Sequence, residues 1–403
     1  WRTALEPSLR RQARCLAANL EHDVPNNHLI GNYRALAWVG LLFEHWPESE
    51  GWRKVGLKGL WWEMDRQILP DGVHDERSLS YHPIVLRDLF ETWQLARRRG
   101  VDTPSHLSET LGKMLCFLVA TRTPNGTWPM VNDSVPTYPE DRAALIDSVT
   151  SALEQPSERP NRVDDAGVSA FPEAGYAILR PTPDDYLFFD AGPMGPTQVP
   201  GHGHADALSF VLYGNGRPLI VDPGVDTYEA GQRRDELRSI AVHNTVTVDD
   251  QEPCTFWGPF RVTDLPGACL IEWSESHLLG QHQGYKRLAH GVTHHRRITW
   301  LDDGCWEIHD RFEGVGEHTF AFNLQLAPGA QVDLEGLDAV ARWSDGTQLV
   351  MRPDVPLAEA RTEIVEGWVA PDWNRRVAAS RYLLRWNAQV PFELRTRLEV
   401  DIV

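Results

Sequence analysis

The spacing of apolar residues changes near the middle of the chain. Through roughly the first 150 residues, apolar side chains recur every three or four positions, which is the period of an amphipathic helix. Five such stretches, separated by breakers rich in Pro, Gly and Asn, predict helices over residues 6–22, 32–46, 51–68, 83–100 and 108–123. Helices that follow one another through short links are typical of a helical bundle or an α/α toroid.

Beyond about residue 171 the apolar runs become short and rich in β-branched and aromatic residues, and several alternate. They predict strands over 174–181, 185–192, 207–214, 217–224, 243–250, 267–276, 293–303, 305–314 and 318–329. Such a density of strands favours a large antiparallel β-sandwich. A polar, Pro-rich segment lies between the two regions. We therefore expect a helical domain over 1–154, a linker over 155–170 and a β-sandwich over 171–403.

Composition narrows the class of protein. A chain of 403 residues suits two domains, and sixteen tryptophans provide packed cores or flat platforms for sugar rings. The net charge of −18 argues against a nucleic-acid partner, although a local group of Arg and His can still bind a polyanion. Five scattered cysteines without a CxxC pair leave at least one thiol unpaired. No apolar run approaches the roughly 18 residues that a membrane span needs.

The stretch "GHGHADALSFVLYGNGRPLIVDPG" carries the first candidate chemistry. On a strand, His202 and His204 would point to the same face, because side chains alternate with period two. Asp222 precedes a Pro-Gly turn, and His243 opens another apolar run. Each alone is an ordinary turn or strand residue. Two His and one Asp from three strands, however, are a donor set for Zn²⁺ with a fourth position open or water-filled, and we favour a metal or catalytic site.

Two polar loops carry further candidates. In "VPNNHL", Asn26 or Asn27 is a natural helix N-cap, which places His28 in a first turn that favours a carboxylate; simple capping is the alternative. The loop "DGVHDERSLSYHP" ends in Tyr81, just before Pro83 opens a helix. Tyr81 is either a core residue or a phenol that exchanges a proton in a cleft.

The motifs "NNHL", "DGVHDERSLSYH", "GHGHADALSFVLY", "IVDPGVDTY" and "RSIAVHNTVTVDD" follow the order seen in heparinase II/III-like polysaccharide lyases. The chain resembles this superfamily, which includes alginate and oligoalginate lyases, from about residue 26 through about residue 311. The resemblance implies an α+β multidomain fold, with an incomplete α/α toroid followed by an antiparallel β-sandwich. The helical part is short for the family, so we expect further toroid helices upstream of Trp1.

The chemistry that the resemblance implies is β-elimination beside a uronate carboxylate, which leaves a 4,5-unsaturated uronate end. The carboxylate must be neutralised before the C5 proton is removed, and an acid must protonate the departing C4 oxygen. The resemblance assigns carboxylate neutralisation to Asn27, aided by a histidine, and makes Tyr81 the acid and, for syn elimination, also the base. His28 or His202 would be the base for the opposite C5 epimer. Arg77, which we also assign to substrate binding, or nearby imidazoles would supply the cations that lower a tyrosine pKa.

Three residues match the zinc ligands of the family: His204, Asp222 and His243. Zinc in the family looks structural, because it pins strands and orients the neighbouring His202. Tyr228 and Arg238 lie at motif positions between Asp222 and His243, and we assign them to substrate contact or to support of the site.

The expected partner is an acidic polysaccharide: a heparin or heparan-type glycosaminoglycan, alginate, or a bacterial exopolysaccharide. Overall acidity favours a chain with less sulfation. Two other classes of function stay open. One is a non-catalytic polysaccharide-binding protein, and the other is a zinc hydrolase, which the lack of an HExxH motif disfavours. A homodimer is one expected assembly, and the bacterial periplasm or the outside of the cell is the expected location.

Overall fold

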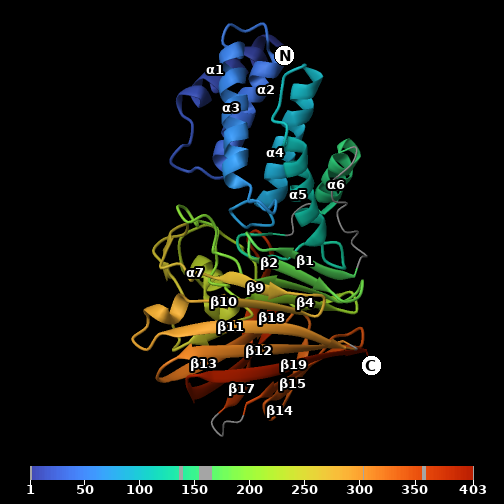
Figure 1. Cartoon of the computed structure of the whole chain (residues 1–403), viewed down its shortest axis with the longest axis vertical. Coiled ribbons are helices and arrows are strands. Elements are labelled where there is room, and N and C mark those ends of the chain that lie inside the picture. Colours follow the sequence, from blue (N-terminus) through green and yellow to red (C-terminus); the bar gives the residue numbers. More distant parts are fainter. Residues whose placement is uncertain (1, 136–138, 154–165, 303, 356–359, 403) are drawn as a thin grey trace. The chain divides into compact units, whose positions relative to one another are not determined.

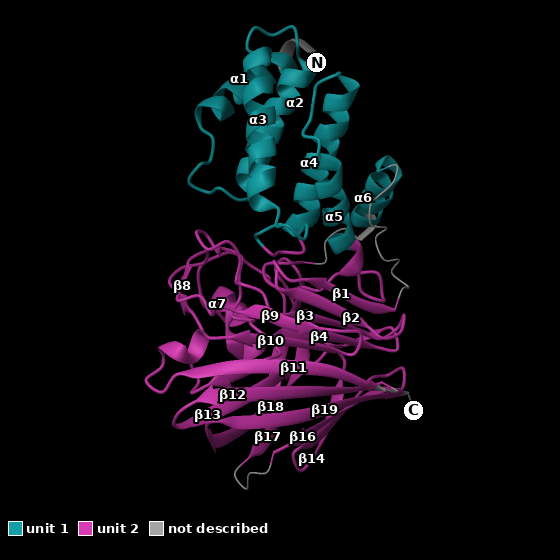
Figure 2. Cartoon of the chain, in the orientation of Figure 1, with its two compact units in different colours: residues 1–76, 81–118, 140–160 teal, residues 77–80, 119–139, 161–403 magenta. Residues whose placement is uncertain are grey.

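The computed structural model describes residues 2–135, 139–153, 166–302, 304–355 and 360–402 (Figure 1). The chain divides into two compact units (Figure 2). The helical unit comprises Trp1–Glu76, Tyr81–Leu118 and Glu140–Pro160. The strand unit comprises Arg77–Ser80, Val119–Pro139 and Asn161–Val403. Of the predicted linker, residues 155–165 lie outside the described residues, and its last part belongs to the first strand.

All five predicted helices are present in the helical unit, with one more that was not predicted. They are α1 (Arg2–Ala18), α2 (Asn27–Leu42), α3 (Ser49–Gln67), α4 (Tyr81–Arg98), α5 (Leu107–Ala120) and the additional α6 (Pro139–Ala152). Helix α2 begins at Asn27, five residues before the stretch that the apolar period predicts and directly after Asn26, one of the two predicted N-cap residues. The added turn contains Leu29 and Ile30, which are buried. Burial of these two side chains stabilises the added turn.

Helices α2 and α3 pack closely because glycines line their contact. A Cβ on Gly40 of α2 would lie 2.4 Å from the backbone nitrogen of Arg53, and one on Gly56 of α3 would lie 2.3 Å from that of Ala37. Both distances are shorter than any non-bonded contact of a real side chain. The two glycines therefore let the helix backbones approach. Among the described residues, no helix combines the length and the apolar character that crossing a bilayer requires.

The strand unit contains three large antiparallel sheets, whose strands run in the following orders. The five-stranded sheet is β1 (Gly167–Phe171), β2 (Tyr176–Arg180), β3 (Tyr186–Asp190), β4 (Ser209–Gly214), β5 (Arg217–Ile220). The eight-stranded sheet is β14 (Gln331–Glu335), β15 (Asp338–Arg342), β16 (Thr347–Asp354), β19 (Phe392–Ile402), β12 (Cys305–Gly314), β11 (Val292–Asp302), β10 (His277–His282), β9 (Cys269–Trp273). The four-stranded sheet is β17 (Arg361–Asp372), β18 (Arg375–Gln389), β13 (Glu317–Gln325), β6 (Val246–Val248).

Shorter elements connect these sheets: the two-stranded pair β7 (Thr255–Phe256) and β8 (Val262–Thr263), helix α7 (Gln232–Arg238), and the 3-10 turns η1 (Ile240–Val242) and η2 (Gly284–Arg287).

One hydrophobic core draws on all three large sheets. Alternate residues of β12 are buried, and among them Phe312 lies 4.6 Å from Phe320 of β13, between ring centroids. Phe320 in turn stacks on Trp386 of β18 at 5.2 Å. The contact between Phe312 and Phe320 joins the eight-stranded and four-stranded sheets, while Phe320 and Trp386 are neighbours within the four-stranded one. The predicted fold class, a helical region followed by antiparallel β-sheets, is confirmed.

Candidate active site

His202 and His204 lie in the long connection between β3 and β4 rather than on a strand, so the predicted strand geometry is wrong. The glycine between them explains the difference. A Cβ on Gly203 would lie only 2.2 Å from the carbonyl oxygen of Met194. The backbone can pass this close to another segment only at a glycine, and it forms a turn there. Asp222 and His243 likewise lie just beyond β5 and η1, in loops.

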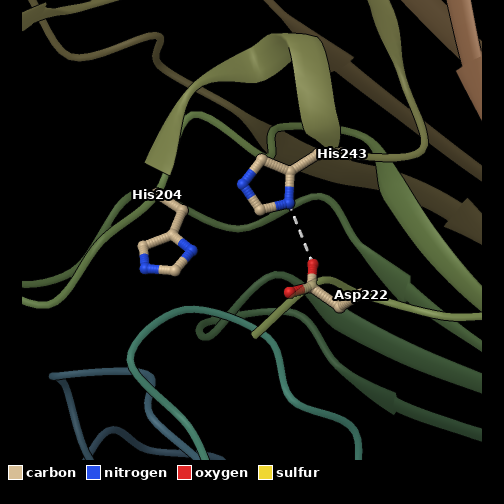
Figure 3. A group of neighbouring side chains, drawn as sticks. All are labelled: His204, Asp222 and His243. Carbon is tan, nitrogen blue, oxygen red and sulfur yellow. Dashed lines mark hydrogen bonds and ion pairs between the residues drawn. The ribbon is translucent and has the colours of Figure 1, made fainter. Parts of the chain in front are cut away.

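The predicted metal ligands nevertheless come together. His204, Asp222 and His243 are all buried, and one potential ligand atom from each lies within 4.8 Å of the others. Figure 3 shows the three side chains facing one another. Asp222 Oδ2 accepts a hydrogen bond from His243 Nδ1 at 3.0 Å, while Asp222 Oδ1 accepts one from the backbone nitrogen of Gly224 at 2.9 Å. The grouping predicted from the sequence is confirmed.

The donor atoms of this group fit a metal ion. Among the described residues, His204 Nδ1 and His243 Nε2 are buried without a hydrogen-bond partner. A buried polar atom left in this state costs about 1–3 kcal/mol, unless something binds it. Burial lowers the pKa of His204 to about 4, so the ring is neutral at pH 7, the form that binds metals. Two imidazoles and a carboxylate are a donor set that suits zinc, so this group could hold a metal ion.

One buried carboxylate that the sequence did not single out binds both histidines of the "GHGH" motif. Asp133 Oδ2 lies 2.8 Å from His202 Nδ1, and Asp133 Oδ1 lies 3.0 Å from His204 Nε2. The guanidinium of Arg234, from α7, donates to both oxygens of the same carboxylate. Burial alone would raise the pKa of Asp133, but the two histidine hydrogen bonds and the charge of Arg234 hold it well below its ordinary value.

This arrangement sets the tautomers of both histidines. An ionised carboxylate can only accept hydrogen bonds, so the proton of His202 lies on Nδ1 and that of His204 lies on Nε2. In a neutral ring, Nε2 of His202 is then the basic nitrogen, and Nδ1 of His204 carries the lone pair that a metal would use. Asp133 thereby orients both rings and sets which nitrogen of each carries the proton.

Backbone contacts hold Asp133 in place. The amide nitrogen of Asp133 donates to the carbonyl oxygen of His202 at 3.0 Å. The side-chain oxygen of Asn132 accepts from the amide nitrogen of His204 at the same distance. Asn132 adopts a left-handed backbone with φ +55°, which Asn tolerates better than most residues. The only sequence signal for this contact is the polar triplet "NDS" between two valines, which an ordinary turn explains equally well.

Tyr81 directly follows a segment that is bonded to Asp133. This segment, Arg77–Ser80, belongs to the strand unit. Within it, Ser78 Oγ donates to the carbonyl oxygen of Asp133, and the amide nitrogen of Leu79 donates to Ser134 Oγ, both at 2.9 Å. Tyr81 is half-buried and is the first residue of α4. Tyr81 therefore follows, in the sequence, a segment that is hydrogen-bonded to Asp133 and Ser134.

Arg77, predicted to contact substrate, is buried and bonded to the backbone. Its guanidinium donates to the carbonyl oxygens of Ala174 at 3.0 Å and Glu173 at 3.1 Å, in the turn between β1 and β2. These hydrogen bonds hold the guanidinium of Arg77 against the turn. Its role in substrate binding stays a prediction.

Tyr228 and Arg238 differ in exposure. The ring of Tyr228 is half-buried, with its centroid 5.8 Å from that of His202. Arg238 is fully buried; its guanidinium donates to the carbonyl oxygen of Gly258, and its own carbonyl oxygen accepts from Ala205, next to His204. Of the two predicted alternatives, support of the site suits Arg238 better than substrate contact does.

In the helical unit, Asn27 is the first residue of α2 and its side chain is held by an acid. Asn27 Nδ2 donates to Glu76 Oε2 at 2.7 Å, and Glu76 is buried. The ring of His74 lies 3.6 Å from the same Glu76 oxygen. Because one N–H of the Asn27 amide is bound to Glu76, the orientation of the whole amide is defined. Glu76 was not identified from the sequence, where it stands in a loop rich in charged residues.

The first turn of α2 partly follows the predicted capping. Asn26 occupies the N-cap position, but its side chain makes no capping hydrogen bond. His28 lies in the first turn as predicted, with 52% of its side chain exposed and its ring 3.6 Å from Glu21. It is more exposed than His202, whose side chain is 12% exposed.

Two family models together match almost the whole chain. The model described as heparinase II/III N-terminus matches residues 4–160, and the one described as heparinase II/III-like, C-terminal, matches residues 164–397. A heparin-sulfate lyase of Bacteroides thetaiotaomicron is 25% identical over 347 residues, which cover 76% of this chain and 47% of the relative. One of Bacteroides stercoris is 23% identical over 374 residues, covering 88% and 54%. The chain thus spans about half the length of the curated relatives it matches.

Solved structures show the same fold. A crystal structure of heparinase III has a TM-score of 0.81 and 21% sequence identity, covering 98% of this chain and 64% of that one. A crystal structure of heparan sulfate lyase from Pedobacter heparinus has a TM-score of 0.77 and 18% identity, covering 98% and 62%.

Proposed function

Because this chain belongs to the heparinase II/III-like family, we propose that it is a polysaccharide lyase that cleaves a heparan-type glycosaminoglycan or a related uronate polymer by β-elimination. The substrate class rests on the curated relatives, which are named heparin-sulfate lyases. The reaction rests on the side chains described above, because β-elimination needs a group that neutralises the carboxylate, a base and an acid.

The observation that carries the proposal is the double role of Asp133. This carboxylate holds His202 with its Nδ1 protonated, and its own backbone is bonded to the segment that leads into Tyr81. A buried, charged hydrogen-bond partner fixes the direction of an imidazole. Within the described part of the chain, His28 is half exposed and its charged neighbour is Glu21, 3.6 Å away. We therefore assign to His202, rather than His28, the role of base for one C5 epimer.

In the proposed reaction, Tyr81 protonates the departing C4 oxygen as the bond between C4 and that oxygen breaks. The base removes the C5 proton, and the electron pair of the C5–H bond becomes the new double bond between C4 and C5. Tyr81 itself serves as base in syn elimination, while His202 Nε2 accepts the proton when the C5–H bond points the other way. The Asn27 amide, oriented by Glu76, donates its remaining N–H to the uronate carboxylate. This bond stabilises the negative charge that spreads into the carboxylate.

The proposal includes a zinc ion bound by His204, Asp222 and His243. When bound, the ion would supply a positive charge and a rigid anchor for three loops, the usual contribution of a structural zinc site. His204 also binds Asp133, so the position of Asp133 depends on the same anchor.

The test is the ultraviolet absorbance of the unsaturated uronate while the protein is mixed separately with heparin, heparan sulfate, heparosan, hyaluronan and alginate. We expect absorbance to rise with a heparan-type polymer and Tyr81→Phe to reduce the rate by about 100- to 10,000-fold. Tyr81→Phe is the matched change, because it removes the hydroxyl group and keeps the ring. New reducing ends without absorbance would indicate a hydrolase. No cleavage of any polymer by a folded, zinc-loaded protein would contradict the lyase proposal.

A further inference from the structure

Three aromatic side chains from separate loops gather next to His202 in the strand unit. Tyr228 lies before α7, Phe260 lies between β7 and β8, and Trp373 lies at the turn between β17 and β18. The ring centroid of Tyr228 is 4.7 Å from that of Trp373 and 5.2 Å from that of Phe260, with edge-to-face geometry in both pairs. The His202 ring is 5.9 Å from Phe260 and 5.8 Å from Tyr228. The aromatic group is thus continuous with the proposed catalytic histidine.

Two of these rings remain open to solvent. Phe260 is 38% exposed and Trp373 is 39% exposed, although apolar side chains of this size are usually covered. Both contact Tyr228, so the exposed surface belongs to one group rather than to scattered residues. Exposed aromatic groups beside a polar site are typical of ligand contacts, because an aromatic face binds the C–H face of a sugar ring.

The turn that carries Trp373 is fastened rather than loose. The guanidinium of Arg376 binds Asp226 Oδ2 at 2.7 Å and Glu236 Oε2 at 2.8 Å. The amide nitrogen of Asn374 donates to the carbonyl oxygen of Asp226 at 2.8 Å. Asp226 is buried and lies two residues before Tyr228. These contacts hold the hairpin turn against the loop of Tyr228. Little conformational entropy is therefore lost at Trp373 when a ligand binds.

A buried arginine supports the other two rings. The Arg234 guanidinium lies 5.1 Å from the ring centroid of Tyr228 and 5.7 Å from that of Phe260. The same guanidinium holds Asp133, the partner of His202. Arg234 therefore contacts two rings of the aromatic group as well as the carboxylate that holds His202.

We propose that Tyr228, Phe260 and Trp373 form a stacking platform for a pyranose ring of the polymer, adjacent to the sugar on which His202 acts. The inference rests on the proposed function. The platform binds a sugar next to the reacting one, so it contributes equally to the bound substrate and to the transition state. Its loss raises KM and leaves kcat nearly unchanged.

The test compares two exposed tryptophans in the full chain. Trp373→Ala removes the platform ring, and Trp273→Ala is the matched control, because Trp273 of β9 is 41% exposed and its strand is at the edge of the eight-stranded sheet. We expect Trp373→Ala to raise KM about three- to tenfold, the effect of losing one aromatic contact. Phe260→Ala should act in the same direction. Trp373→Phe should keep most of the affinity, and the control should match the wild-type protein.

Native electrophoresis through gels that contain heparan sulfate measures binding without catalysis. We expect Tyr81→Phe to be retarded like the wild-type protein and the Trp373→Ala variant to be retarded less. Unchanged KM and retardation in Trp373→Ala would overturn the platform but leave the lyase intact. A changed oligomeric mass with unchanged sugar binding would instead identify the platform as an interface between copies of the chain. A wild-type protein that neither cleaves nor is retarded by any of the five polymers would overturn both proposals.

Discussion

The strand unit contains two groups of His, Asp and Arg side chains that use the same residue types but differ in burial and pairing. The site cluster consists of Asp133, His202, His204 and Arg234, and the buried network consists of His282, His294, Arg296 and Asp310. In both, an aspartate accepts hydrogen bonds from histidine and from an arginine guanidinium. Neither group can be told from the other by composition.

In the buried network, the polar side-chain atoms are hydrogen-bonded to one another and to the backbone. Asp310 accepts from His294 Nε2 at 2.6 Å and from Arg296 Nε at 2.7 Å. His294 Nδ1 lies 3.2 Å from His282 Nε2, and His282 Nδ1 accepts from the backbone nitrogen of Gly284. All four side chains are fully buried. The network is completely paired, which is how a polar group in a core stabilises one packing arrangement.

The site cluster differs in two respects. The side chain of His202 is 12% exposed, and His204 Nδ1 is buried with no hydrogen-bond partner among the described residues. The network also supports the site, because Arg296 donates to the carbonyl oxygens of Leu208 and Asn244, close in sequence to His204 and His243. The comparison teaches that incomplete pairing and residual exposure, rather than the residue types, distinguish a group that can bind a ligand from a closed one.

The largest expected difference between the two groups is in activity. Asp133→Asn replaces an acceptor with an amide that can no longer hold both histidines in their present tautomers, so we expect the elimination rate to fall about 100- to 10,000-fold. Asp310→Asn is the matched control, because it makes the same change in the network. Rates are measured in the ultraviolet on protein whose folded fraction is determined by circular dichroism. Equal losses of activity in the two variants would contradict the expectation that Asp133 matters more for the reaction than Asp310 does.

The buried network should dominate stability. Arg296→Met leaves Asp310 charged in the core without its arginine partner, and we expect the free energy of unfolding to fall by about 3–5 kcal/mol. The double variant Arg296→Met/Asp310→Leu removes both charges and should recover most of this loss. Urea unfolding of the three proteins measures the effect. A double variant as unstable as the single one would mean that the backbone bonds of Arg296, rather than the ion pair, carry its contribution.

A paired histidine in the helical unit extends the comparison to pH. His82 Nε2 donates to the carbonyl oxygen of Met114, and burial, together with the charge of Arg142, lowers its pKa to about 4. A pKa lower in the folded than in the unfolded chain gives stability that is complete above about pH 6.5 and is lost as the pH falls toward 4. The total loss should be about 3 kcal/mol. Urea unfolding of the wild-type protein and His82→Gln between pH 7 and pH 4 tests this, with a flatter profile expected for the variant.

The last expected difference concerns the metal. We expect about one zinc per chain by mass spectrometry, lost in His243→Ala but kept in His294→Ala, although both histidines are fully buried. When zinc is present at about a hundred times its dissociation constant, its binding should raise the free energy of unfolding by about 3 kcal/mol. A chelator should remove this contribution. A melting temperature that does not respond to chelator or to added zinc would contradict a structural ion at this group.

Much of the fold could be predicted because it depends on local patterns. The change of apolar period identified the helices and the first strands, since each element must bury one face or stripe. The apolar period alone placed the start of α2 too late, because Asn27 and His28 are polar, whereas the predicted N-cap at Asn26 or Asn27 located it. Helix α6 was not predicted.

The candidate site divides in a similar way. His204, Asp222 and His243 were predicted as one group, and the structure brings them together. The predicted strand around His202 and His204 was wrong, because the approach of Gly203 to Met194 depends on a segment elsewhere in the fold. The assignments of Asn27, His28, Tyr81, His202 and Arg77 to catalysis or substrate binding stay predictions.

By itself, the sequence determined where helices give way to strands and which donors form the metal group, because these properties lie in short motifs and local periodicity. Only the tertiary structure decided that Asp133 holds His202 and His204, from 69 and 71 residues away, and that Asp310 belongs to a closed network instead. Both aspartates have polar neighbours in sequence. What separates them is how completely the surrounding loops and sheets enclose and pair each carboxylate, and contacts between residues far apart in sequence determine that.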